Sequence, residues 1–155
     1  FREAGMPNSR LIIAGDGNEE KDASEAVRQA ARGADNVDLH LDFIESEELL
    51  NMIAACDVVS QPYQRVLNSG TLLLSMACRR PFLAPAKGTI AELADEVGDD
   101  WIMTYQGEFD ASHLKMARAR FDRDEHSVRL PAMEKFDWDT IVLQTHSFFQ
   151  GVMKA

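Results

Sequence analysis

The stretch SQPYQRVLNSGTLLLSMACRRPFLAP, which runs from Ser60 to Pro85, sets the fold class of this chain. It predicts the end of a strand, a long loop, a helix that begins at Asn68-Ser69-Gly70-Thr71, and a second strand over Pro81 to Ala84. A strand, a helix and a second strand in succession are the repeating unit of a parallel α/β sheet. Because ligands bind beyond the carboxyl ends of such strands, the loop is a candidate binding site.

The rest of the chain repeats this alternation. Strands are predicted over Arg10–Ala14, Val37–Phe43, Asp57–Ser60, Pro81–Ala84 and Trp101–Tyr105, and helices over Glu19–Ala34, Ser46–Ala55, Ser69–Cys78, Thr89–Glu96 and Ala111–Arg120. We therefore expect an α/β, Rossmann-like domain over residues 1–135, with a parallel sheet of about five strands and helices on both faces. Val37–Phe43 alternates apolar with polar residues, which places it nearer an edge of the sheet.

The two ends of the chain carry separate expectations. Residues 121–135 are charged and contain Pro131, and residues 136–155 predict a last helix with a partly apolar face. We expect this helix to pack back on the domain or across to another domain. The opening FREAGMPNS is typical of the middle of a helix, so we expect further polypeptide before Phe1.

Composition limits the function. A net charge of −10 argues against a nucleic-acid partner, although Arg65, Arg79 and Arg80 are either a local anion-binding spot or solvated surface. Cys56 and Cys78 lie in apolar runs, which favours free thiols in a reducing, cytoplasmic setting. The sequence contains no apolar run of about 18 residues and no signal peptide.

Five loops are predicted to meet at the carboxyl edge of the sheet: Gly15–Asn18, Ile44–Glu45, Gln61–Asn68, Pro85–Gly88 and Gln106–Glu108. The GDG of the first loop is either a plain turn or a place where the backbone approaches a ligand. At the helix start, Asn68 or Ser69 caps the helix, and the free N–H groups favour an anion. Gly70 removes bulk there, and the Ser69 and Thr71 hydroxyls are further donors, but an ordinary helix cap explains the same residues.

Other chemistry finds little support. The sequence has no nucleophile elbow and no H-E-x-x-H motif, and its four histidines are scattered. Two D-x-D triplets, Asp122-Arg123-Asp124 and Asp137-Trp138-Asp139, occur late in the chain and away from the predicted strand ends. We expect neither a metal ion nor a cofactor.

The order of these motifs resembles the C-terminal, donor-binding domain of GT-B glycosyltransferases, in the retaining, glycogen-synthase-like branch. The matching segments are LIIAGDG from Leu11, VDLHLDFIESEELLNMIAACDVVSQPY from Val37, LLLSMACRRPFLAP from Leu72, KGTIAEL from Lys87 and FDWDTI from Phe136. The resemblance implies a full-length hexosyltransferase that uses a nucleoside-diphosphate sugar without a metal ion, in bacterial polysaccharide or glycolipid synthesis. It also implies a sugar or lipid-linked acceptor held by a preceding N-terminal domain, with peripheral membrane association.

The resemblance assigns roles to single residues. It places the donor diphosphate on Ser69, Gly70 and Thr71 and turns Gly15 and Gly17 toward the donor. It places the nucleotide base around Phe43 and Ile44. Glu92 matches a family glutamate whose role is either donor contact or helix stabilisation.

The chain also departs from the family. Where the family has two glutamates for the donor sugar and the ribose, this chain has Val66 and Leu74, which accept no hydrogen bond. Either Tyr63, Gln64 or Asn68 makes the hydrogen bonds of those glutamates, or the chain belongs to a divergent branch. Such a branch would resemble bacterial exopolysaccharide transferases that have an N-S-G-T-x-L-L helix.

The family's first strand of this domain and its acceptor domain would precede Phe1, so we expect no transfer by residues 1–155 alone. Two other functions stay open: a phosphorylase or epimerase of the same fold, and a non-catalytic module that binds a nucleotide or a partner.

Overall fold

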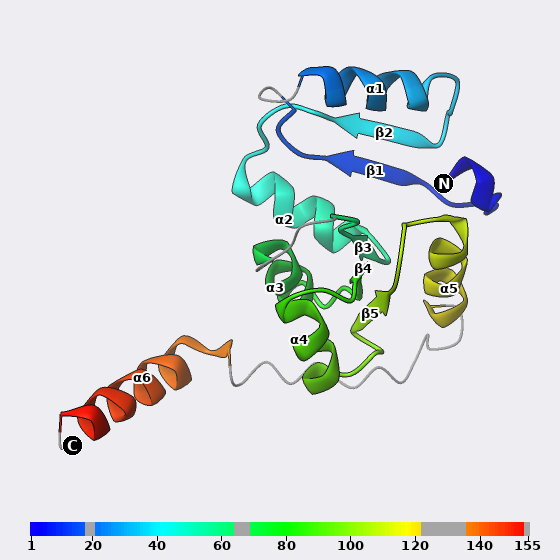
Figure 1. Cartoon of the computed structure of the whole chain (residues 1–155). Helices are drawn as coiled ribbons and strands as arrows, with labels where there is room; N and C mark the ends of the chain where they lie inside the picture. Colours follow the sequence, from blue (N-terminus) through cyan, green and yellow to red (C-terminus); the bar gives the residue numbers. More distant parts are fainter. Residues whose placement is uncertain (18–20, 64–68, 122–135, 154–155) are drawn as a thin grey trace.

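The computed structural model describes residues 1–17, 21–63, 69–121 and 136–153 of the chain (Figure 1). The elements in chain order are η1 (Arg2–Ala4), β1 (Leu11–Ala14), α1 (Lys21–Ala31), β2 (Val37–His40), α2 (Ser46–Ala55), β3 (Val59–Ser60), α3 (Gly70–Ala77), β4 (Phe82–Pro85), α4 (Thr89–Val97), β5 (Ile102–Tyr105), α5 (Ala111–Phe121) and α6 (Trp138–Val152). The predicted strands and helices are all present, with ends that differ by a few residues.

β4 is the centre of the fold. It pairs in parallel with β3 and with β5, with Phe82 opposite Val59 on one side and Ile102 on the other. Phe82, Leu83 and Ala84 are each 0% exposed. A parallel strand buried on both faces reads as a continuous apolar run, and FLAP is such a run.

Helices cover both faces of this three-stranded sheet. Phe82 and Ala84 pack with Leu72 of α3 and Ile90 of α4 on one face. On the other face, Leu83 packs with β5 and with α5, of which Ala117 is the buried contact. The predicted fold class, a parallel sheet between two helical layers, is confirmed.

β1 and β2 form a second, two-stranded parallel sheet, with Leu11 opposite Val37. In the described residues β2 pairs only with β1, so the predicted edge position is confirmed. β2 ends at His40, before the predicted Phe43, because the next residue leaves the strand ladder: the Leu41 carbonyl accepts a hydrogen bond from the Gly17 N–H at 3.1 Å. The five strands therefore form two separate hydrogen-bonded sets.

The link from α3 to β4 is short and tightly hydrogen-bonded. Arg79 takes a left-handed conformation with a φ of 57°, and its N–H donates to Met76 O at 2.9 Å. Ser75 Oγ donates to Arg80 O at 2.8 Å, and Arg80 Nη2 donates to Ala54 O at the end of α2 at 2.5 Å. The bonds to Met76 O and Ala54 O satisfy carbonyl groups that helix ends leave unpaired.

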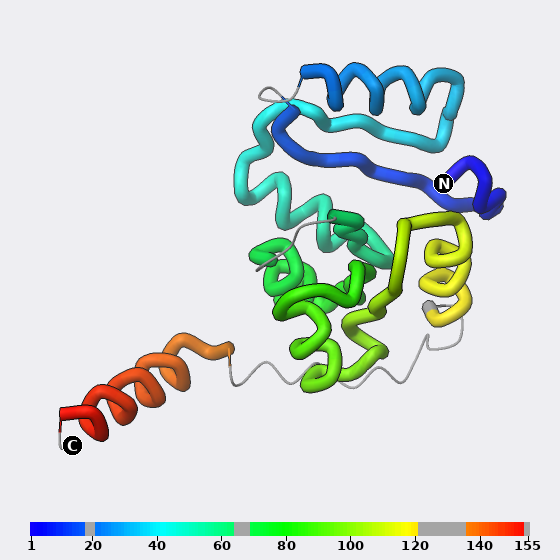
Figure 2. The backbone as a smooth tube through the Cα atoms, viewed as in Figure 1, coloured from blue at the N-terminus to red at the C-terminus, as the bar shows by residue number. Residues whose placement is uncertain are grey.

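The outer helices are less buried. α1 buries no residue, and its alanines Ala23, Ala26 and Ala30 are exposed. α6 also buries no residue and lies apart from the other elements (Figures 1 and 2). Its packing across another domain stays a prediction.

Two smaller expectations concern the cysteines and membrane spans. Both thiols are free, as predicted, and burial raises the pKa of Cys56. Among the described residues, the helices are all too short or too polar to cross a bilayer.

Neighbouring leucines on α3 test the position of the core. Leu72 is fully buried and Leu73 is 40% exposed. We expect Leu72→Ala to lower the free energy of unfolding by about 2–5 kcal/mol, because it opens a cavity against β4, and Leu73→Ala to cost clearly less. Urea unfolding of the full-length protein measures both. Equal losses would mean that this face of α3 does not form the core.

Candidate functional site

The site was predicted at the carboxyl edge of the parallel strands, and the glycine loop at this edge is tied to its neighbours. The Gly15 N–H donates to His40 O at 3.0 Å, and Ser24 Oγ of α1 donates to Gly17 O at 2.8 Å. A β-carbon on Gly17 would overlap the Ser24 hydroxyl, so packing alone requires glycine there. Gly15 has a φ of 156°, and no heavy atom of the described residues lies within 4 Å of the position of a β-carbon there. Of the two glycines, Gly15 is the one that leaves room for a ligand.

Ser69 is the N-cap of α3. Its Oγ accepts a hydrogen bond from the Leu72 N–H at 3.1 Å and donates to Gln61 Oε1 at 2.5 Å. Gln61 is fixed in turn, because its backbone N–H donates to Leu83 O of β4 at 3.0 Å. The proton and one lone pair of the Ser69 hydroxyl are thus engaged within the protein. The structure favours a capping role for this side chain over a direct phosphate contact.

The start of α3 still presents backbone donors that the helix itself leaves unpaired. The N–H groups of Gly70 and Thr71 lie in the first turn of the helix, where no intrahelical carbonyl reaches them. Gly70 is exposed, and no heavy atom of the described residues lies within 4 Å of the position of a β-carbon there. Thr71 is half-buried. Asn68, Gln64, Arg65 and Val66 fall outside the described residues.

The residues predicted to hold a base are on the surface. Phe43 is 70% exposed, Ile44 is half-buried, and Tyr63 is 59% exposed. Phe43 and Ile44 lie between β2 and α2, and Tyr63 follows β3. Two exposed aromatic rings on loops that follow parallel strands are available for stacking. Leu74, which stands where the family has a glutamate, is also partly exposed, on α3.

The loop between β4 and α4 adds a residue to which the sequence reasoning gave no role. Lys87 is exposed directly after β4, and its own N–H donates to Pro85 O at 2.8 Å. Gly88, with a φ of 55°, leads into α4. Glu92 is exposed in the first turn of α4, where a carboxylate favours the positive helix end. The position of Lys87 between a predicted strand end and a predicted helix start was the feature of the sequence that could have identified it as a candidate site residue.

The described part of this edge is acidic. Its described loops contain Lys87 as their one Lys or Arg, against five carboxylates: Asp16, Asp42, Glu45, Glu108 and Asp110. Arg79 and Arg80, which the sequence offered as an anion-binding spot or as solvated surface, precede β4. They therefore lie at the amino end of that strand. Arg80 also caps α2, so these arginines are not at the candidate site. An anion at this edge is met mainly by backbone N–H groups and Lys87.

The loop after β5 packs an aromatic cluster under this edge. Tyr105 and His113 have ring centroids 4.4 Å apart, and Phe109 stacks on His113. Burial raises the pKa of Tyr105, so its phenol is neutral. Hydrogen bonds from the Ser112 hydroxyl and N–H lower the pKa of Asp110, which is the carboxylate at the start of α5. The Asp110 carboxylate is thus engaged in hydrogen bonds within the protein, so this part of the edge has a structural role.

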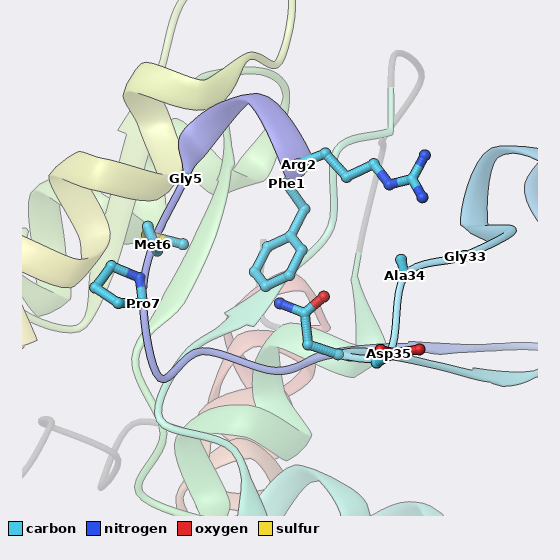
Figure 3. Close-up of a pocket in the computed structure, with 9 residues that line it drawn as sticks. Phe1, Arg2, Gly5, Met6, Pro7, Gly33, Ala34 and Asp35 are labelled. Carbon is cyan, nitrogen blue, oxygen red and sulfur yellow. The ribbon is translucent and has the colours of Figure 1, made fainter.

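A cavity of about 460 Å³ lies elsewhere, between the segments Phe1–Pro7 and Gly33–Asn36 (Figure 3). Both segments precede strands, β1 and β2, so the cavity lies at the amino edge of the sheet. Ligands of parallel sheets bind at the opposite edge. No group of three or more metal-ligating side chains occurs in the part of the chain that the structure describes.

Comparison with known proteins gives a consistent result. Residues 2–118 match the model of the family described as "Glycosyl transferases group 1". A GDP-mannose:glycolipid 4-beta-D-mannosyltransferase from Xanthomonas campestris pv. campestris is 40% identical over 103 residues, which are 65% of this chain and 29% of that protein. A protein of the same name from a strain of that pathovar is 39% identical over the same length. The chain thus spans less than a third of these relatives.

Among solved structures, sucrose-phosphate synthase from Thermosynechococcus elongatus superposes with a TM-score of 0.69 at 21% identity. The match covers 98% of this chain and 40% of the synthase. It supports the GT-B fold predicted from the motifs.

Two glycines of the edge are expected to respond differently to alanine. Gly17→Ala overlaps the Ser24 hydroxyl, so we expect it to cost about 1–3 kcal/mol in the free energy of unfolding. Gly70→Ala enters open space inside a helix and is expected to be neutral or stabilising. A double-mutant cycle with Ser24→Ala, read by urea unfolding of the full-length protein, should recover part of the Gly17 loss. No coupling between the two sites would contradict the contact.

Proposed function

This chain belongs to the group 1 glycosyl transferases and is a GT-B glycosyltransferase domain, and on that basis we propose that the full-length protein transfers mannose from GDP-mannose to a hydroxyl of a glycolipid. The observation that carries the proposal is the 40% identity over 103 residues with mannosyltransferases named for that donor and acceptor. In this chain the matched segment forms an α/β domain of the donor-binding type. The start of α3, at the carboxyl edge of its sheet, favours the binding of an anion.

The proposed reaction breaks the bond between the mannose anomeric carbon and the oxygen of the β-phosphate, and forms a bond from the acceptor oxygen to that carbon. GDP leaves with the bonding electron pair, and the acceptor hydroxyl gives up its proton. In this proposal the first-turn N–H groups of Gly70 and Thr71, the helix dipole and Lys87 stabilise the charge on GDP. Transfer without a metal ion is part of the proposal, because these groups take the electrostatic role that a metal ion has elsewhere.

The remaining predicted contacts fit the same donor. Phe43 and Tyr63 offer exposed rings to the guanine base, and open space at Gly15 lets the backbone approach the nucleotide. A glycolipid acceptor would bring the enzyme to a membrane surface. The acceptor and the rest of the catalytic machinery are assigned to the part of the polypeptide outside residues 1–155, because the relatives are more than three times as long as the matched segment.

Turnover tests the reaction. The full-length protein is incubated with a lipid-linked oligosaccharide acceptor and with GDP-mannose, GDP-glucose, UDP-glucose or UDP-galactose, with and without EDTA. We expect mannosylated glycolipid and GDP from GDP-mannose only, at the same rate in EDTA. Release of free mannose phosphate or isomerised nucleotide sugar would instead indicate a phosphorylase or epimerase. Binding of GDP-mannose with no product from a panel of acceptors would favour the non-catalytic module.

A charge change at the cap of α3 tests the diphosphate position. Asn and Asp cap helices as well as Ser, so Ser69→Asn and Ser69→Asp should both keep the fold. They differ in charge and in the amide donor that only Asn offers to Gln61 Oε1. A carboxylate near the diphosphate costs on the order of 1–4 kcal/mol, so we expect Ser69→Asp to weaken GDP-mannose binding about tenfold or more relative to Ser69→Asn. Isothermal titration of the full-length variants measures this ratio. Equal affinities would place the diphosphate away from α3.

A further inference from the structure

The first turn of α5 is closed by reciprocal hydrogen bonds. Asp110 stands at the N-cap position, and its Oδ1 accepts the Ser112 N–H at 2.7 Å and the Ser112 hydroxyl at 2.6 Å. In return, Nδ1 of His113 accepts the Asp110 N–H at 3.1 Å. In a capping box, the side chains of the N-cap residue and of the third helical residue each accept a backbone N–H in this way. Here an imidazole, which titrates near neutral pH, stands where glutamate or glutamine is usual.

Nδ1 of His113 has a second neighbour that the capping box does not use. It lies 3.2 Å from Oδ1 of the same Asp110. A backbone N–H only donates a hydrogen bond and a carboxylate only accepts one, so a single ring nitrogen binds one of them at a time. With a lone pair, Nδ1 binds the N–H, and with a proton it binds the carboxylate. The protonation state of His113 therefore selects between two arrangements of this turn.

We propose that His113 is a pH-sensitive cap of α5. The neutral imidazole, with its proton on Nε2, holds the Asp110 N–H and closes the capping box. When a proton from solvent binds Nδ1, the imidazolium releases this N–H and forms an ion pair with the Asp110 carboxylate. The same two residues thus hold the turn in both states, through different atoms.

Packing keeps the imidazole within reach of both partners. The His113 side chain is 17% exposed, and its ring centroid lies 4.4 Å from that of Tyr105 and 5.9 Å from that of Phe109. These two rings belong to the end of β5 and to the loop that follows it. Aromatic rings also accommodate an imidazolium, because their negative faces attract a cation. Protonation therefore exchanges the hydrogen bond without expelling the ring from its site.

The titratable groups in contact with His113 keep their charge between about pH 5 and 8, the range in which histidine changes its own. Hydrogen bonds from the Ser112 hydroxyl and N–H lower the pKa of Asp110, so its carboxylate is ionised throughout. Burial raises the pKa of Tyr105, so its phenol is neutral throughout. The other charged residues of the loop, of α5 before Arg120 and of η1, which packs against α5, are exposed to solvent: Glu108, Lys115, Arg118, Arg2 and Glu3.

The cap acts on one loop of the ligand edge. Residues 106–108 connect β5 to this turn and are exposed. The body of α5 is anchored separately, because Ala117 is buried against β5 and Leu83 of β4. Release of the Asp110 N–H therefore loosens the loop and leaves the helix in place. The inference depends on these hydrogen bonds and not on the reaction proposed above.

Nuclear magnetic resonance of the ¹⁵N-labelled full-length protein tests the cap. We expect the His113 ring to give the ¹⁵N shifts of the Nε2–H tautomer at pH 8 and those of the imidazolium at pH 5. Over this range the protection of the Asp110 amide, relative to the unstructured exchange rate at each pH, should fall about tenfold with the loss of one hydrogen bond. The Ala117 amide is the internal control and should keep its protection.

Three results in the unmodified protein would each overturn the proposal. The first is an Nδ1–H tautomer at pH 8, which could not accept the Asp110 N–H. The second is a His113 ring that stays neutral at pH 5. The third is an Asp110 amide whose protection does not follow the titration of the ring.

Substitutions separate the cap from general effects of pH. Glutamine accepts the N-cap N–H and does not titrate, so His113→Gln should keep the Asp110 amide protected at pH 8 and at pH 5. His113→Ala has no acceptor and should leave that amide about tenfold less protected at both. His146→Gln, in α6, should retain the pH response. If protection of the Asp110 amide still fell with pH in His113→Gln, another group would be responsible and the proposal would be wrong.

Discussion

The burial of β4 on both faces is the constraint on which the rest of this structure depends. Phe82 and Ala84 fill the face under α3 and α4, and Leu83 fills the face under α5. A strand of this kind must have a strand on each side and a helical layer above and below. β3, β5 and three helices are held in place by this requirement, and the loops at the carboxyl edge are positioned with them.

The candidate site is coupled to that core through a short chain of contacts. Leu83 O of β4 holds Gln61, Gln61 Oε1 accepts the Ser69 proton, and Ser69 Oγ caps α3. The direction in which the first turn of α3 presents its N–H groups is thus set from the centre of the sheet. These contacts hold the N–H groups of that turn in one direction, which favours the binding of an anion.

The sequence was sufficient for the elements and their order, because apolar runs such as FLAP and the alternation of VDLH follow from burial on two faces or one. It was not sufficient for side chains with two possible uses. Ser69 read equally well as a cap or as a phosphate ligand, and Arg80 as an anion site or as a surface residue, until their partners were seen. Gly17 depends on Ser24, seven residues away, so no local pattern revealed it. The division of the sheet was also hidden, since hydrogen bonds between distant strands leave no mark on either segment.

The acidity of the ligand edge has a consequence for how quickly a donor arrives. The described residues of its loops carry five carboxylates and one lysine, so an anion that approaches them is repelled by their net charge. Dissolved salt shortens this repulsion to a Debye length of about 8 Å at physiological ionic strength. Most phosphate-binding proteins lose encounter rate as salt rises, because attraction steers their ligands. A surface with the composition of these described residues has the opposite dependence, because dissolved salt weakens its repulsion of an anion.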